Sequence, residues 1–169
     1  MTDSDPLSEI GVTLFRLGLA TVVGGVLGLN RELHHKSAGM RTHALVCLGS
    51  ALVTFFSIEM VNSGKTQDIG PVTRVIQGVV TGIGFVGAGV IFREDGGKTI
   101  KGLTTAASIW VVACLGMACG AGRVIPVLVA CGISLFVLVY GGPIERFAHR
   151  HLLPDDPDSQ PTPPGDDGP

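Results

Sequence analysis

The stretch Gly78-Val79-Val80-Thr81-Gly82-Ile83-Gly84-Phe85-Val86-Gly87-Ala88-Gly89 decides the fold. It carries no charge and lies in an apolar segment, at about 72 to 92, that is long enough to cross a hydrocarbon layer about 30 Å thick as a helix. A helix is expected because a single segment in lipid must satisfy its own backbone hydrogen bonds. The glycines leave at least one face without side-chain bulk, which favours close helix packing. These packing candidates are Gly78, Gly82, Gly84, Gly87 and Gly89.

Two other interpretations of this glycine-rich stretch are a pore or ion path and a dinucleotide site. A backbone-lined pore or ion path is the alternative to close packing and stays open at this point. The spacing of Gly82, Gly84 and Gly87 also fits the Gly-x-Gly-x-x-Gly pattern of dinucleotide sites. That pattern needs a preceding strand and a crossover unit, and the sequence here is an apolar segment, so we reject a dinucleotide site.

Composition extends the membrane interpretation to the rest of the chain. Of the 169 residues, 46% are hydrophobic and 15% charged, whereas soluble domains have roughly a quarter charged residues. The mean hydropathy is +0.47. We therefore expect an all-α integral membrane protein with about five transmembrane helices. Besides the segment at 72–92, the apolar segments lie at about 11–29, 43–61, 103–119 and 122–141.

The distribution of charge predicts how the chain lies in the membrane. Lys and Arg concentrate after the first and third segments and near the C-terminal end, and the positive-inside rule places these regions in the cytoplasm. No signal-peptide pattern is present, so we expect the first helix to direct insertion. The expected parts are an acidic tail outside at 1–10, a membrane domain at 11–141, a basic juxtamembrane segment at 142–153 and a disordered acidic, Pro-rich cytoplasmic tail at 154–169.

A weak internal repeat relates the first two helices to the next two. Arg31-Glu32 follows the first segment and Arg93-Glu94 follows the third. Each following helix then contains Cys-Leu-Gly, at 47–49 and at 114–116. Our hypothesis is a duplicated helix pair in parallel orientation plus a fifth helix, an arrangement that occurs in transporters.

Several polar side chains lie toward the outer half of the predicted bundle. Arg16 is inside the first segment, where an Arg at the helix centre costs about 2.5–3.5 kcal/mol on insertion. It either snorkels to the nearby interface or pairs with an acid, for which Glu59 and Asp68 are the candidates. The same two acids are weak candidate metal ligands. Arg74 and Gln77 share one helix face. They either belong to a binding site for an ion or a partner or make polar contacts between helices, and both interpretations stay open.

A second polar group is expected at the cytoplasmic side. Arg31 and Arg41 are of the type that contacts lipid phosphates. Thr104, Thr105 and Ser108 open the fourth helix, where hydroxyls can cap the helix and then bond to neighbouring helices. No nucleophile motif and no phosphate-binding loop is found, so we expect no enzyme and no nucleic-acid binding. We expect no cofactor, with Mg²⁺ the one candidate ligand or effector.

Four blocks together resemble the MgtC/SapB family of bacterial inner-membrane proteins. They are Asn30-Arg31-Glu32, Ala38 to Val46, Gly82 to Ile91 and Lys101 to Trp110. Their order and spacing match across about residues 14 to 140. The polar positions that match are Arg16, Arg31, Glu32, Arg41, Thr42, Arg74, Gln77, Thr104 and Thr105.

The resemblance implies a multi-pass inner-membrane protein linked to magnesium limitation, membrane potential and virulence. It implies a regulator that contacts another membrane complex such as the ATP synthase. The alternatives are a transporter or channel component for magnesium or another cation, for which a homo-oligomer would supply the pathway, and a structural membrane component. Asn30 and Pro71 stand where the family usually carries an acid, and Asp68 is the acid nearest to the second of these positions.

Overall fold

The computed structural model describes residues 6–64, 68–94 and 99–152. Within them, five helices are long and apolar enough to cross a membrane, which confirms the predicted all-α membrane fold. The acidic tail expected at 154–169 lies outside the described residues. The helices are α1 (Pro6–Leu33), α2 (Met40–Ser63), α3 (Gly70–Ala88), α4 (Leu103–Gly120) and α5 (Val124–Leu152).

The two outermost helices are longer than their apolar segments. α1 starts at Pro6, so part of the acidic tail expected up to residue 10 is helical. Proline suits the first helical position because its missing N–H would have no partner there anyway. α5 continues through Pro143 to Leu152, so the segment expected as a juxtamembrane region is the last part of a helix.

A short β-hairpin connects α3 to α4. The sequence places the end of the third helix near residue 92, but α3 ends at Ala88. Residues Phe92–Glu94 form β1, which pairs antiparallel with β2 at Thr99–Lys101. Gly89 follows the last residue of α3 directly, and glycine is a poor helix former. The connection between α1 and α2 is a turn, so the two halves of the proposed repeat differ there, and the duplication stays a hypothesis.

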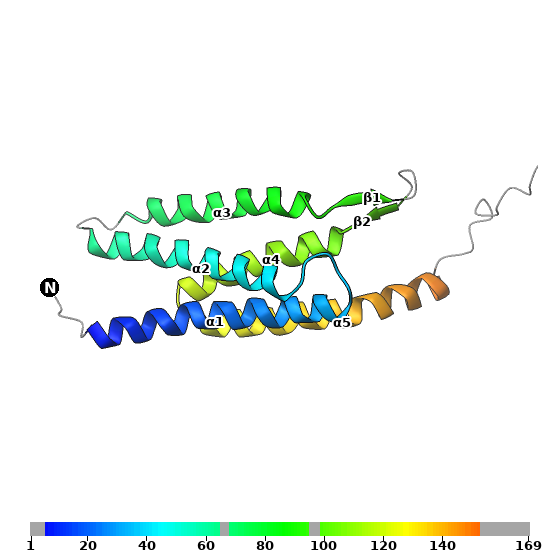
Figure 1. The fold of residues 1–169 in the computed structure, drawn as a ribbon, viewed down its shortest axis with the longest axis horizontal. Helices are drawn as coiled ribbons and strands as arrows, with labels where there is room; N and C mark the ends of the chain where they lie inside the picture. The colour runs from blue at the N-terminus through cyan, green and yellow to red at the C-terminus, as the bar shows by residue number, and fades with distance from the viewer. Residues whose placement is uncertain (1–5, 65–67, 95–98, 153–169) are drawn as a thin grey trace, which may run out of the picture.

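All five helices run along the long axis of the molecule (Figure 1). The hairpin, the α1–α2 connection and the last turns of α5 lie at one end, called here the hairpin end; the N-terminus of α1 and the start of α3 lie at the other, the N-terminal end (Figure 1). α2 contacts α1, α3 and α4, and α5 packs on α4 and α1. The hydrophobic core comes from α1, α2, α4 and α5, and α3 contributes none of the described core residues.

Two glycine pairs bring α1 and α4 close to α2. A methyl group added to Gly24 would lie 2.5 Å from the carbonyl oxygen of His43, and one added to Gly28 would lie 2.7 Å from the Cα of Met40. Methyl groups on Gly116 and Gly120 would meet the α2 backbone at Cys47 O and Ala51 O. Both pairs have Gly-x-x-x-Gly spacing, which lets helix backbones approach closely in lipid.

The turn between α4 and α5 is as tight as the sequence predicts. Gly122 takes the left-handed conformation with φ +72°, which costs glycine little because it has no Cβ. Its N–H donates to Cys119 O at 2.9 Å, and the Arg123 N–H donates to Ala118 O at 2.9 Å. This is the Schellman pattern, which ends α4 and lets α5 fold back against it.

Candidate functional site

Polar side chains from three helices meet inside the protein at the hairpin end. Arg31, in the last turn of α1, is only 4% exposed. Its Nη2 donates a hydrogen bond to Thr105 Oγ1 on α4 at 3.0 Å. Its Nε is buried and has no hydrogen-bond partner among the described residues. Arg31 therefore differs from the exposed interfacial arginine that the sequence led us to expect, because it ties α1 to α4 from inside.

His43 links α2 to the same place. Its ring is fully buried, with Nδ1 at 2.9 Å from Gly39 O and Nε2 at 3.0 Å from Ser108 Oγ. A carbonyl can only accept, so in the neutral ring Nδ1 carries the proton and Nε2 accepts one from Ser108. Ser108 Oγ also lies 2.8 Å from Thr105 O, a second acceptor for the same proton. Arg31, His43, Thr105 and Ser108 form a continuous chain of contacts, called here the polar network.

The structure refines what the sequence suggested for the start of α4. Thr105 and Ser108 do bond to neighbouring helices, but neither hydroxyl caps α4. Gly102 occupies the cap position with φ +93° and offers no side-chain oxygen. The exposed Thr104 lies outside the polar network.

Glu32 fixes the connection between α1 and α2. Its Oε2 accepts a hydrogen bond from the Met40 N–H at 3.0 Å, at the first turn of α2. Gly39, the cap residue of α2, has no side chain that could accept this hydrogen bond. The Glu32 carboxylate also lies at the positive end of the helix dipole, where a negative charge is favourable. Arg41 and Thr42 are exposed on the same turn and lie outside the polar network.

A cleft of about 780 Å³ opens beside the polar network at the hairpin end. The end of α1, the start of α4 and the stretch of α5 from Val137 to Pro143 form its walls. None of the described residues that line it is acidic. Its basic and hydroxyl-bearing lining residues are Arg31, His34, Lys36, Thr104 and Thr105.

A smaller cavity of about 230 Å³ adjoins this cleft on the side of the membrane interior. It lies between α1, α4 and α5, and most of its lining is aliphatic. Thr104, Val137 and Leu138 line both spaces. A polar cleft and an apolar cavity thus lie side by side and share part of their walls.

Arg16 anchors the N-terminal end of α1. Its Nη1 donates to Gly120 O at 3.1 Å, and its guanidinium lies over the Phe55 ring at 5.6 Å from the ring centre. A Cβ added to Gly122 would lie 3.1 Å from the same guanidinium. These contacts hold α1 against the end of α4 and against α2, and Glu59 is not among the partners of Arg16.

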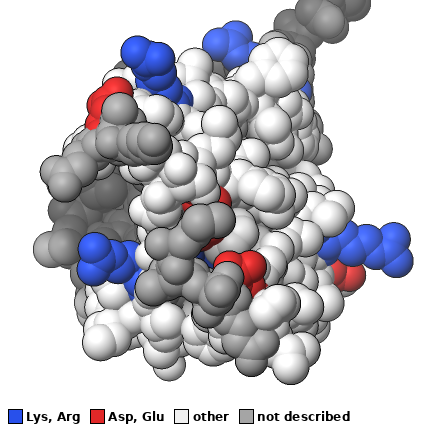
Figure 2. All heavy atoms as spheres, turned by 90° about the vertical axis from the view of Figure 1, so that its left-hand side faces the viewer, with Lys and Arg blue, Asp and Glu red and all other residues white. Residues whose placement is uncertain are grey.

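The other polar residues predicted at this end are not brought together. Glu59, Arg74 and Gln77 are exposed. Asp68 Oδ1 accepts the N–H of Gly70, the first residue of α3, at 2.8 Å. Figure 2 shows this end of the molecule, where the acidic and basic groups are spread over the face and do not gather in one patch. In the described part of the chain, no three His, Cys, Asp or Glu side chains gather as a metal site would require.

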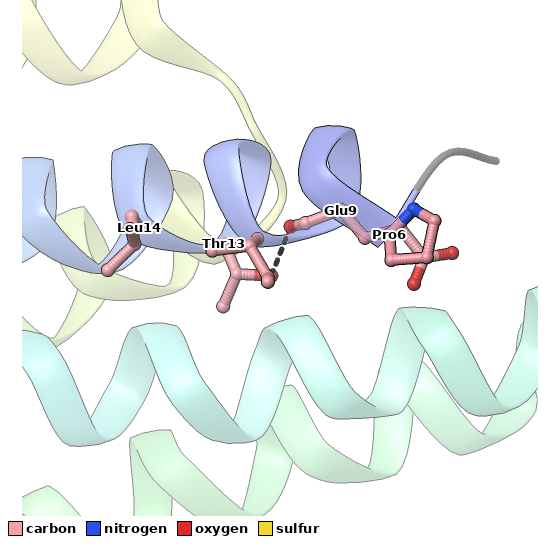
Figure 3. A pocket seen from close by; sticks show the side chains of 5 residues that line it. Pro6, Glu9, Thr13 and Leu14 are labelled. Carbon is pink, nitrogen blue, oxygen red and sulfur yellow. Dashed lines mark hydrogen bonds between the residues drawn. The ribbon is translucent and has the colours of Figure 1, made fainter.

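A hollow of about 400 Å³ also lies at the N-terminal end. All of its lining residues, Pro6, Glu9, Ile10, Thr13 and Leu14, belong to the first turns of α1 (Figure 3). The Thr13 hydroxyl donates to Glu9 O at 2.8 Å and is therefore engaged within the helix. A hollow lined by a single helix does not bring polar groups onto a ligand from different directions.

The glycines of α3 have different surroundings from the pairs in α1 and α4. Cβ atoms added to Gly78, Gly82 or Gly84 would have nothing within 4 Å. One added to Gly87 would lie 3.6 Å from Ala106 Cβ on α4, and one added to Gly89 would meet only its own helix. Within this chain, close packing through Gly78, Gly82 and Gly84 stays a prediction.

Sequence reasoning missed the two glycine pairs of α1 and α4 that pack against α2, and it gave no weight to His43. The signal was present, because Gly24-x-x-x-Gly28 and Gly116-x-x-x-Gly120 have the spacing of helix-contact motifs. His43, Cys47, Ser50 and Thr54 recur at helical spacing on one buried stripe of α2.

Comparison with known proteins agrees with this architecture. A model of the MgtC family matches residues 17–147. The protein SrpB of Synechococcus elongatus is 44% identical over 114 residues, which cover 64% of this chain and 63% of that protein. The protein MgtC of Brucella abortus is 44% identical over 105 residues, covering 62% of this chain and 41% of that protein.

A third relative has a name that refers to transport. The "Putative magnesium transporter YhiD" of Escherichia coli is 43% identical over 112 residues, covering 64% of this chain and 51% of that protein. The chain thus spans about half the length of the known proteins that it matches. No solved structure matches it.

Proposed function

The chain belongs to the MgtC family, and from that premise we propose that it is an inner-membrane regulator that acts by contact with another membrane complex. Its N-terminus lies outside and its C-terminus in the cytoplasm, as the Lys and Arg distribution favours. The role is linked to magnesium limitation, membrane potential or virulence. The chain spans about half of its relatives, so activities of the whole relatives come to it only as part of this proposal.

The open glycine face of α3 is the observation that carries the proposal. Gly78 and Gly82 have the same spacing as the pairs that dock α1 and α4 on α2, but none of the described residues lies against them. Phe85, one turn further along the same face, is 86% exposed. The face therefore has the spacing of a helix contact, and no described helix of this chain packs against its glycines.

Energetics favour a partner for this face. Each glycine in a helix interior costs about 1 kcal/mol relative to alanine. Lipid tails give no hydrophobic drive for helix association, so the benefit of a glycine face is close backbone contact with another helix. A transmembrane helix of a larger complex is the occupant that we propose, with a membrane subunit of the ATP synthase as the first one to test.

Photocrosslinking tests the contact directly. A photoreactive residue replaces Phe85 on α3, and in a matched protein it replaces Phe136, which is exposed on α5 at 59%. We expect a crosslink to one membrane protein from position 85, stronger in cells grown at low magnesium, and only lipid or background from position 136. Equal labelling from both positions would contradict the proposal, and a crosslink to a second copy of the chain would replace it by a homo-oligomer.

Cation transport is the second candidate. Glu59 is exposed near the end of α2 and Asp68 shortly before α3, and Mg²⁺ sites often use one or two carboxylates and retained waters. The name of YhiD refers to magnesium transport as well. Purified protein in liposomes is compared with a Glu59→Gln, Asp68→Asn double variant. Magnesium flux that the double variant loses would favour transport, whereas no flux from folded protein would count against it.

A further inference from the structure

The cleft at the hairpin end lies at the level where lipid headgroups begin. Its α5 wall runs from Val137 to Pro143, and the apolar span of that helix ends at Ile144. Its α1 wall includes Arg31, close to the end of that helix at Leu33. A ligand in this cleft would therefore have its polar part at the membrane surface.

The charge of the cleft favours an anion. Arg31, Lys36 and His34 are on its wall, and no described residue of its lining is acidic. Arg31 is more than nine-tenths buried, its Nη2 donates to Thr105, and its Nε has no partner in the part of the chain that the structure describes. A buried cation without a counter-charge is unfavourable unless something else supplies that charge.

The start of α4 adds backbone donors to the same wall. Gly102 to Thr105 line the cleft, and no side chain caps this helix. The first N–H groups of an uncapped helix point outward with the positive end of the dipole, which suits an anionic oxygen. The buried arginine and the helix start thus face one space from two different elements.

The adjoining apolar cavity distinguishes a lipid from a free anion. It lies next to the cleft, shares Thr104, Val137 and Leu138 with it, and is otherwise lined by residues closer to the middle of α4 and α5. We propose that the cleft binds the phosphate of an anionic phospholipid, whose acyl chain occupies the apolar cavity. Arg31 and Lys36 contact the phosphate, the N–H groups at the start of α4 donate to it, and Val137 and Leu138 contact the chain.

Lipid retention by the full-length chain tests this assignment. The protein is purified in detergent and titrated with phosphatidylglycerol, phosphatidylcholine or inorganic phosphate, and bound species are counted by native mass spectrometry. We expect phosphatidylglycerol to bind more tightly than phosphatidylcholine, with Lys36→Gln reducing that preference about fivefold, the effect of about one interfacial charge. The matched control is Arg41→Gln, an exposed charge at the same end that is not part of the cleft lining; it leaves the preference unchanged.

A second variant separates the two sources of phosphate. Val137→Trp fills the mouth of the apolar cavity without removing a charge. The proposal expects it to weaken phosphatidylglycerol binding while Arg41→Gln does not. Equal retention of the two lipids by the unmodified protein would overturn the proposal. Displacement of phosphatidylglycerol by inorganic phosphate together with no effect of Val137→Trp would overturn the lipid assignment and leave a phosphate site.

Discussion

Helices α3 and α4 carry the same glycine spacing in opposite surroundings. On α4, methyl groups at Gly116 or Gly120 would run into the backbone of α2. On α3, methyl groups at Gly78 or Gly82 would enter open space. The comparison shows that the same Gly-x-x-x-Gly spacing occurs in two surroundings: the α4 pair contacts α2, and the α3 pair contacts none of the described residues.

The polar side-chain contacts distinguish α3 from α1, α2 and α4 as well. The polar network ties α1, α2 and α4 together, and Arg16 ties α1 to the end of α4. The polar residues of α3 that the sequence singled out, Arg74 and Gln77, are exposed. Side-chain hydrogen bonds thus join α1, α2 and α4, whereas α3 packs on α2 and α4 without a contribution from Arg74 or Gln77.

The largest effect is expected where the glycine pair of α4 meets α2. Gly116→Ala should destabilise the folded protein by about 1–3 kcal/mol, because the methyl group overpacks the contact with Cys47. Unfolding in mixed micelles can be followed by the fluorescence of Trp110, the one tryptophan of the sequence. The control is Gly132→Ala on α5, where nothing lies within 4 Å; a similar loss at both positions would contradict the comparison.

A smaller effect is expected in the polar network. His43→Leu and Ser108→Ala should each cost about 0.5–1.5 kcal/mol of unfolding free energy, because each removes the hydrogen bond between α2 and α4. Both changes break the same bond, so the double variant should cost less than the sum of the two single variants. Strict additivity in this cycle would show that His43 and Ser108 do not interact.

Much of the fold follows from hydrophobicity alone. Five apolar segments near 20 residues long leave few alternatives in lipid, and the tight α4–α5 turn is evident from Gly120 to Arg123. The hairpin between α3 and α4 was missed because residues 89–92 are as apolar as the helix before them. The pairing of Phe92–Glu94 depends on the strand that returns at Thr99–Lys101, which lies outside the apolar segment.

The site was harder to predict than the fold. Arg31 continues the buried stripe of Ala20, Gly24 and Leu27 at helical spacing, so its burial could have been foreseen. That Thr105 bonds to Arg31 and Ser108 to His43 could not be foreseen, because both contacts depend on how α4 crosses α1 and α2. Arg16 likewise finds Gly120, far away in sequence, in place of the acid that charge pairing suggested.

The most direct test of the account compares the unfolding and the partner recovery of one double variant, Gly78→Leu with Gly82→Leu. Leucine adds bulk to α3 where the chain places nothing, so the unfolding midpoint should stay within the error of the unmodified protein. The partner crosslinked from position 85 should no longer be recovered, because the two helix backbones can no longer approach. A lowered midpoint, or full recovery of the partner, would contradict the claim that this face exists for another protein.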